Sequence, residues 1–269
     1  MNGRRIVART RGQQHGFIRR LVSPGDPISE RIKPFVFLDG IAGPVASGTG
    51  FGWHPHSGIA TLTYALDADV AYEDTAGQQG VVHATGLEWM RAGGGTWHQG
   101  SIHPHSATVT AFQLWLALPP ELENGPAEGI YVAPKAVPQL GPVRLLLGHY
   151  GESSNPIPTP SPLLYLDVEL AAGQTWSFLP PRGHNVAWIY VYRGQAQVGG
   201  EAVGDELVVL APGDGAVAIT ALPPARLLLG SGVQHNHPLV LGSHSVHTSR
   251  EALARGLQGI AASQPATSA

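Results

Sequence analysis

Hydrophobic and polar residues alternate with a period of two along much of the chain, in short runs that end at turn residues. Residues 59–66 form one such run, and residues 110–118, which end at Pro119 and Pro120, form another. Because successive side chains of a strand point to opposite faces, this alternation predicts half-buried β-strands. Short strands with turn signals such as Gly86 between them are typical of a sandwich or barrel. The pattern therefore predicts an all-β fold.

The expected strands form two sets, one in each half of the chain. The first set covers residues 4–9, 16–22, 33–39, 59–66, 70–74, 79–84 and 110–118, with a turn at 13–15. The second set covers residues 143–148, 164–170, 187–192, 206–210, 216–219 and 225–230. Prolines crowd between Pro119 and Pro162, which favours a boundary there. We expect two domains, residues 1–135 and 136–269.

One helix is expected, near the end of the sequence. Ser249 is a suitable N-cap, and Glu251, Ala252 and Leu253, which follow it, are good helix formers. The expected architecture is thus two β domains followed by a short C-terminal helix.

Composition narrows the classes of function. The 269 residues are 43% hydrophobic and only 13% charged, which allows a sizeable core, and 35 glycines with 23 prolines fit many tight turns. A net charge of -3 gives no basic surface for nucleic acid. The absence of cysteine excludes disulfides and thiolate metal sites. With no apolar run long enough for a signal peptide or a membrane span, we expect a cytoplasmic protein.

Three histidines stand where a metal site could form. His54 and His56 are two residues apart, so a strand would present both imidazoles on one face. If a strand that carries His98 pairs nearby, a third imidazole reaches the same point. Neutral imidazoles bind Fe, Zn, Cu, Ni or Mn, and the residues alone do not select among them.

Several motifs around these histidines occur in the order and at the spacing of a known family. They are the Pro-Phe-Val-Phe-Leu-Asp run at 34–39, His-Pro-His-Ser-Gly at 54–58, Glu73-Asp74 and Gly77, Glu-Trp-Met-Arg-Ala-Gly at 88–93, His98, and Phe-Gln-Leu-Trp at 112–115. Together they resemble pirin and its bacterial relatives. The resemblance is specific over residues 33–120 and looser beyond.

The resemblance implies a bicupin, with two antiparallel cupin β-barrels and a metal ion in the N-terminal barrel. Pirins are similar to one another in using an HxH pair, a later histidine and a glutamate two residues after it. His54, His56 and His98 match the three histidines. The glutamate position falls on Gly100, and the position of a glutamate found in many cupins falls on Ala60. The resemblance thus implies a three-histidine site for one divalent transition metal, iron first and Zn, Ni, Mn or Cu as alternatives, or a site that has lost its metal.

Other histidines are weaker candidates. His103 and His105 repeat the His-Pro-His-Ser pattern and could add an imidazole, although a solvated loop is the preferred interpretation. The later histidines are expected in loops after the second set of strands; they are His235, His237, His244 and His247. Arg91 is expected to form an ion pair with Glu88 or Glu73. No Ser-His-Asp arrangement is identifiable.

Two functions from different classes stay open. The first is a metal-dependent dioxygenase that acts on a small molecule, of the flavonol (quercetin-like) or diketone type that the resemblance implies. The second is a non-enzymatic module that binds a protein partner and retains a vestigial metal site. The sequence leaves the catalytic residues, the metal, the true substrate and the oligomeric state open.

Overall fold

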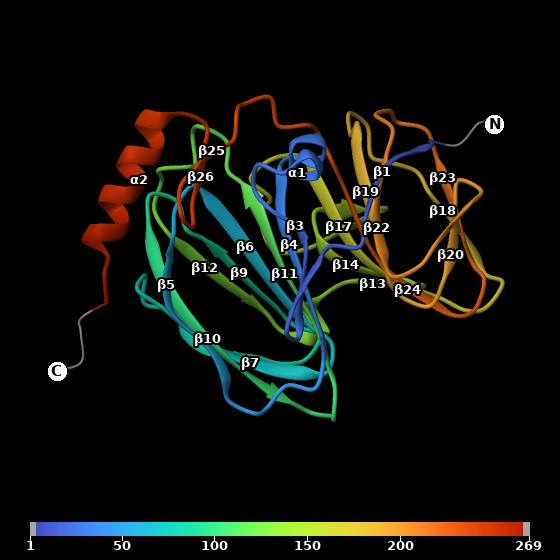
Figure 1. Cartoon of the computed structure of the whole chain (residues 1–269), viewed down its shortest axis with the longest axis horizontal. Coiled ribbons are helices and arrows are strands. Elements are labelled where there is room, and N and C mark those ends of the chain that lie inside the picture. Colours follow the sequence, from blue (N-terminus) through green and yellow to red (C-terminus); the bar gives the residue numbers. More distant parts are fainter. Residues whose placement is uncertain (1–3, 266–269) are drawn as a thin grey trace. The chain divides into compact units, whose positions relative to one another are not determined.

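The structure is a computed structural model that describes residues 4–265, and most of its ordered elements are β-strands (Figure 1). The chain divides into two compact units. The N-terminal unit contains residues 14–30, 35–136 and 236–265, and the C-terminal unit contains residues 4–13, 31–34 and 137–235. Each unit thus includes a segment from the opposite end of the sequence. The division into residues 1–135 and 136–269 stays a prediction.

Two antiparallel sheets form the body of the N-terminal unit. The larger sheet has seven strands in the order β12-β9-β6-β11-β4-β3-β2, and the smaller has four in the order β5-β10-β7-β8. The larger sheet consists of β2 (Gln13–His15), β3 (Ile18–Val22), β4 (Phe35–Gly43), β6 (Ile59–Ala65), β9 (Leu87–Arg91), β11 (Val109–Ala117) and β12 (Glu128–Val132). The smaller sheet consists of β5 (Thr49–His56), β7 (Ala68–Asp74), β8 (Gln79–Val82) and β10 (Thr96–Pro104). A 3-10 turn (Pro134–Ala136) follows β12, and β25 (Val240–Leu241) pairs with β26 (Val246–His247) in the C-terminal segment.

The C-terminal unit repeats this plan. Seven strands pair in the order β1-β22-β19-β24-β17-β14-β13, and four in the order β18-β23-β20-β21. Their bounds are β1 (Ile6–Thr10), β13 (Gln139–Leu140), β14 (Val143–Leu147), β17 (Leu163–Leu170), β18 (Thr175–Phe178), β19 (Val186–Arg193), β20 (Ala196–Val198), β21 (Glu201–Val203), β22 (Glu206–Leu210), β23 (Val217–Ala221) and β24 (Ala225–Gly232); β15 (His149–Tyr150) and β16 (Ser153–Ser154) form a hairpin. Aliphatic side chains from both sheets, among them Leu166, Ile189 and Leu227, fill one core. The expected all-β class with two antiparallel barrels is confirmed.

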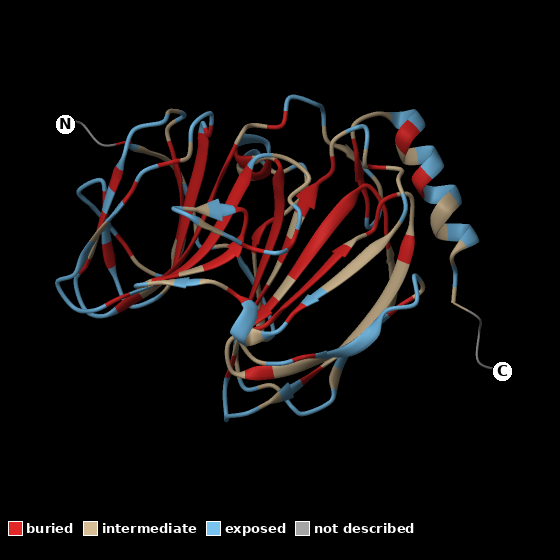
Figure 2. Ribbon diagram, turned by 180° about the vertical axis from the view of Figure 1, so that it is seen from behind, coloured by how far each residue is buried: buried red, intermediate tan, exposed pale blue. Residues whose placement is uncertain are grey.

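Burial follows the strands, as Figure 2 shows: buried residues dominate the large sheets, and exposed residues gather at strand ends and turns. In the N-terminal unit, alternation along β4 and β11 sends Leu38 and Leu114 to one face, where both are buried. The intervening residues Asp39 and Gln113 face the other way, into a cavity. The two-residue period of the sequence therefore places one set of side chains in the buried core and the other set in the cavity.

The predicted C-terminal helix is present as α2 (Arg250–Ala262), and the side chain of Ser249 accepts a hydrogen bond from the Ala252 N–H. Two local predictions need correction. Residues 13–15 form strand β2 instead of a turn, and a second helix, α1 (Pro27–Ile32), lies within a region expected to lack one. Asp26 begins α1 by accepting from the Ser29 N–H at 2.6 Å, with Pro27 in the first turn. Among residues 4–265, neither helix has the length and apolar character needed to cross a membrane.

Candidate metal centre

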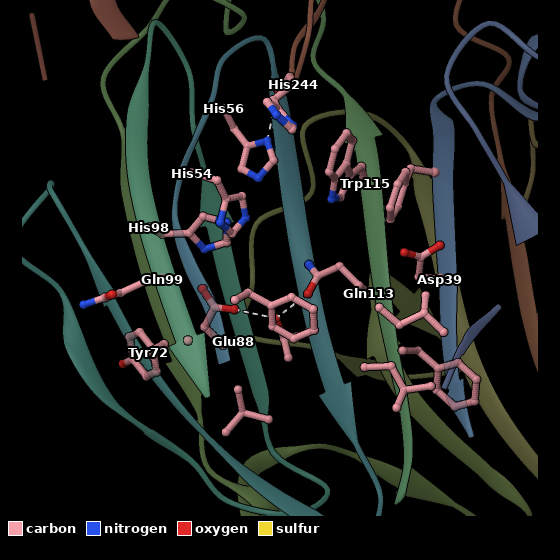
Figure 3. Close-up of a pocket in the computed structure, with 18 of the residues that line it drawn as sticks. Asp39, His54, His56, Tyr72, Glu88, His98, Gln99, Gln113, Trp115 and His244 are labelled. Carbon is pink, nitrogen blue, oxygen red and sulfur yellow. Dashed lines mark hydrogen bonds between the residues drawn. The ribbon is translucent and has the colours of Figure 1, made fainter. Parts of the chain in front are cut away.

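Strands β5 and β10 bring the three predicted histidines together. His98 lies directly opposite His54 in the antiparallel pair, and His56 follows two residues later on the same face. The ring centroids of His54 and His98 are 4.2 Å apart, and His56 is 5.0 Å from each. One nitrogen from each ring lies within 4.8 Å of the other two. Figure 3 shows the three rings converging on one side of the cavity.

Backbone carbonyls select the tautomers of two of these rings. His54 Nδ1 donates to the Gly52 carbonyl at 2.7 Å, and His56 Nδ1 donates to the His244 carbonyl at 3.0 Å. The proton on Nδ1 leaves the Nε2 lone pair of each ring available. His98 Nε2 is buried and has no hydrogen-bond partner among the described residues. This is the arrangement that a metal-binding histidine requires, with its second nitrogen held by a fixed acceptor.

Burial also keeps the imidazoles neutral. It lowers the pKa of His54 and lowers the pKa of His98 well below its ordinary value. For His56, burial and then the neighbouring His54 lower the pKa to about 3. Only the neutral ring can donate its lone pair to an ion. Three neutral imidazoles therefore suit a divalent transition metal, with room for further ligands.

Within residues 4–265, the cluster that could hold a metal consists of the three histidines and includes no carboxylate. Gly100 lies opposite Tyr72 of β7, and a Cβ at this position would sit 2.9 Å from the Ala71 carbonyl oxygen. The neighbouring strand therefore lies close to the glycine, and the glutamate that the resemblance implied would require that strand to shift. Ala60 is fully buried on β6. Gln99 donates to Glu73 at 2.9 Å, and Figure 3 shows its side chain turned away from the histidines.

His103 and His105 are not part of the cluster found in the described residues. His103 Nε2 lies 3.0 Å from the Ser101 hydroxyl, and His105 Nε2 lies 3.1 Å from Asp69 with about half of its side chain exposed. Both are polar contacts near solvent, but only His105 lies outside a strand, because His103 is part of β10 (Thr96–Pro104) and not of the expected loop. They contribute no imidazole to the arrangement described here.

His244 is a site residue that the sequence did not single out. It lies in a loop, as expected, but its ring is 6.0 Å from that of His56, and its carbonyl fixes the His56 tautomer. No local pattern marks this role, because 188 residues separate the two partners.

His247 also has an unexpected position. It is buried, with Nδ1 3.1 Å from Glu123 and Nε2 3.0 Å from the Ser57 hydroxyl. Ser57, His247 and Glu123 are thus joined by hydrogen bonds in a serine–histidine–carboxylate arrangement, which the sequence did not reveal. Ser57 is completely buried, and Gly256 of α2 packs against both Ser57 and His247, so no substrate can reach the hydroxyl. We therefore assign these hydrogen bonds among Ser57, His247 and Glu123 a structural role.

The histidines line a cavity of about 680 Å³ within the N-terminal unit. Trp115 stacks on Phe37 with centroids 4.0 Å apart and meets His56 edge-on at 4.7 Å. Glu88 and Asp39 are the two carboxyl groups among its lining residues, and Arg20 binds Asp39. Glu88 is available to the cavity because Arg91 pairs with Glu128, and not with Glu88 or Glu73 as expected. The cavity thus combines apolar and aromatic walls with polar side chains that converge on it, which is typical of small-molecule sites.

Comparisons with known proteins agree with this architecture. The family model Pirin matches residues 17–116. A protein of Pseudomonas aeruginosa provisionally named a quercetin 2,3-dioxygenase is 29% identical over 90% of each chain. A pirin-like protein of Caulobacter vibrioides is 31% identical over 85% of this chain and 86% of its own length. The crystal structure of a quercetin 2,3-dioxygenase from Acinetobacter baumannii covers 95% of this chain and 96% of its own, with a TM-score of 0.86 at 23% identity. On its sequence, its two cupin barrels and its relatives, this chain belongs to the pirin family.

Proposed function

We propose that this protein is a metal-dependent dioxygenase whose substrate is a flat, enolic small molecule of the flavonol or diketone type. The observation that carries the proposal is the convergence of three neutral imidazoles on the wall of an apolar cavity. The provisional name of the Pseudomonas aeruginosa relative supports the reaction class, and the stacked Phe37–Trp115 pair suits a planar ring.

His54, His56 and His98 would hold the metal ion, each through a nitrogen that faces the cluster. A redox-active ion bound there would supply Lewis acidity toward a substrate oxygen and a centre for oxygen chemistry. This requirement favours iron, with nickel, manganese or copper as alternatives, over zinc, which has no redox chemistry.

The missing carboxylate limits the substrate. With glycine at position 100, no glutamate two residues after His98 can take the substrate's proton, so the substrate must reach its enolate with little help. Acidic enols, such as flavonols and β-diketones, meet that condition.

The test is metal loading followed by oxygen uptake. Protein purified without a histidine tag is loaded anaerobically with Fe(II), Ni(II) or Mn(II), and oxygen consumption is measured with quercetin and with acetylacetone. We expect one metal per chain and uptake with at least one substrate. Absence of uptake with every metal would remove the proposal and leave the non-enzymatic, protein-binding alternative.

Replacing one ligand provides the matched comparison. His56→Ala should lose both metal content and oxygen uptake while the barrel stays folded, because two imidazoles do not hold the ion. His105→Ala should retain both, because the His105 side chain pairs with Asp69 near the surface and is not part of the histidine cluster. Metal content is measured by elemental analysis and folding by circular dichroism. Unchanged metal in His56→Ala would show that the ligand assignment is wrong.

A further inference from the structure

A row of five polar residues crosses the larger sheet of the N-terminal unit on the face of the cavity. Strand register places each member beside the next, in the order Arg20, Asp39, Gln113, Thr63 and Glu88. All five line the cavity. A continuous polar row on an otherwise apolar wall is costly to bury unless its hydrogen bonds are made. Its hydrogen bonds can therefore be counted.

One end of the row is satisfied internally. Arg20 donates to both carboxylate oxygens of Asp39, with the Nη2–Oδ2 distance at 2.9 Å, and its guanidinium lies 4.2 Å above the Phe37 ring. A bidentate pair of this kind uses the acceptor capacity of the carboxylate and holds both side chains in place. This end serves as a fixed wall.

The other end has a donor left over. Thr63 Oγ1 lies 2.7 Å from Glu88 Oε2 and 2.9 Å from Gln113 Oε1. Gln113 Nε2 is buried and has no hydrogen-bond partner among residues 4–265. Figure 3 shows the Gln113 amide extending from its strand toward the side of the cavity that carries the histidines.

The single hydrogen of the Thr63 hydroxyl determines the direction of donation along these hydrogen bonds. The Thr63 hydroxyl has one hydrogen and cannot donate to two acceptors at once. Because Gln113 Oε1 can only accept, the Thr63 hydroxyl donates its hydrogen to Gln113. Its oxygen then accepts a hydrogen bond from the protonated carboxyl group of Glu88. Burial, with Asp74 nearby, raises the pKa of Glu88 to about 7, so the carboxyl carries that proton below neutral pH. The hydrogen-bond chain then runs from Glu88 through Thr63 to Gln113 and leaves the amide N–H groups facing the cavity.

We propose that Gln113 is a ligand-anchoring residue, whose free amide N–H donates to an acceptor oxygen of the bound molecule, and that Thr63 and Glu88 hold the amide in this orientation. The inference rests on the proposed function, since it assigns a second contact to the molecule that the histidine cluster would engage. It also defines the ligand class further. The molecule needs a flat ring for the Phe37–Trp115 wall, an enol oxygen at the histidines and a separate acceptor oxygen for Gln113.

Two flavonols that share the enol end distinguish this contact from the rest of the site. Quercetin carries additional ring oxygens that 3-hydroxyflavone lacks. Dissociation constants for both are measured by tryptophan fluorescence quenching with Ni(II)-loaded protein under anaerobic conditions, and metal content is measured on the same samples. We expect Gln113→Leu to weaken quercetin binding by about 5- to 10-fold, the effect of one hydrogen bond, and 3-hydroxyflavone binding by less than about 2-fold.

Controls separate failure of this inference from failure of the function. Gln79→Leu makes the same change on an exposed residue of β8 and should leave both dissociation constants unchanged. If wild-type protein binds both flavonols and Gln113→Leu binds quercetin equally well, the anchoring role is refuted and the proposed function stands. If wild-type protein binds neither flavonol but consumes oxygen with acetylacetone, the anchoring role toward flavonols is refuted and the proposed function stands; failure of both assays refutes the two together.

The supporting residues have a test of their own. In Glu88→Gln, the glutamine N–H can donate to Thr63 as the protonated carboxyl of Glu88 does. Quercetin affinity should therefore stay within about twofold of wild type. Thr63→Val removes the link and should weaken quercetin binding as Gln113→Leu does. Combining Thr63→Val with Gln113→Leu should add little, because both break one hydrogen-bond chain. A fully additive double variant would show that Thr63 does not act through Gln113.

Discussion

Glu88 is a carboxyl group buried in an apolar cavity, and its surroundings favour the protonated form. Burial raises its pKa to about 7, the hydrogen bond that Thr63 would donate to the ionised carboxylate opposes the shift, and the negative charge of Asp74 adds to it. Tyr72 on β7 and Tyr131, opposite Glu88 on β12, are its other titratable neighbours. The folded protein therefore binds this proton more tightly than the unfolded chain does. The resulting stability is complete below the ordinary pKa of 4.5 and is lost as the pH rises through about 7.

Glu88→Gln should remove this pH dependence. Between pH 5 and pH 8, the free energy of unfolding of wild type should fall relative to the variant by roughly 2 kcal/mol, since the glutamine never ionises. Urea denaturation at both pH values measures the difference. Glu128→Gln, on the exposed side of the Arg91 ion pair, is the control and should show no such divergence. Parallel pH profiles for wild type and Glu88→Gln would contradict the prediction.

At the scale of elements, α2 illustrates how a short signal specifies a boundary. The Ser249 side chain accepts from the Ala252 N–H at 3.1 Å, which satisfies one of the donors left free at a helix start. The helix presents Ala252 and Gly256 as its buried residues. The cap residue Ser249 determines where this helix begins. The small residues Ala252 and Gly256 determine which of its faces packs against the rest of the unit.

Replacing the cap should weaken the helix measurably. Ser249→Ala should lower the free energy of unfolding by about 1 kcal/mol, because the Ala252 N–H loses its acceptor. Ser249→Asp preserves an acceptor and should stay near wild type. Thermal denaturation of the two variants provides the comparison, and equal stability of alanine and aspartate at this position would count against the capping role.

The sequence predicted most of these elements because their signals are local. Alternation and turn residues located the main strands, such as β6 and β11, and the i, i+2 spacing placed His54 and His56 on one face. Helix α1 escaped because its six residues are too few for a helical period to emerge. The strand β2 escaped because three exposed polar residues carry no alternation.

The candidate site was harder to predict than the strands. Gln113, Thr63 and Glu88 lie on three different strands, and only the register of the larger sheet makes them neighbours. An ion pair between Arg91 and Glu88 was the simplest expectation, yet Glu128 on the paired strand takes that arginine. Contacts of this kind depend on pairing between distant segments, which a single sequence does not display.

At the scale of the whole molecule, the segment after residue 235 completes the N-terminal unit. Glu123 anchors it through three hydrogen bonds, from His247 Nδ1 at 3.1 Å, the Thr248 N–H at 2.7 Å and the Thr248 hydroxyl at 2.6 Å. A buried carboxylate with this many donors is difficult to replace, because each donor would lose its partner. The anchor also determines where His244 lies, three residues before His247.

Glu123→Ala should therefore loosen this segment and weaken the metal centre at a distance. We expect a loss of about 3 kcal/mol in the free energy of unfolding, faster hydrogen exchange at Thr248 and a lower affinity for Ni(II), although no histidine is changed. Glu128→Ala, which removes an exposed carboxylate, is the control. Destabilisation with unchanged Ni(II) affinity would show that the anchor does not reach the histidine cluster.

The hydrogen bond between His56 and the His244 carbonyl also bears on the order in which the site forms during translation. A ribosome makes His54, His56 and His98 early, but the acceptor that selects the His56 tautomer is translated 188 residues after His56. Without that carbonyl, the described hydrogen bond that places the proton on His56 Nδ1 is absent. The candidate site therefore reaches its final geometry only after a segment 188 residues farther along the chain has folded against it.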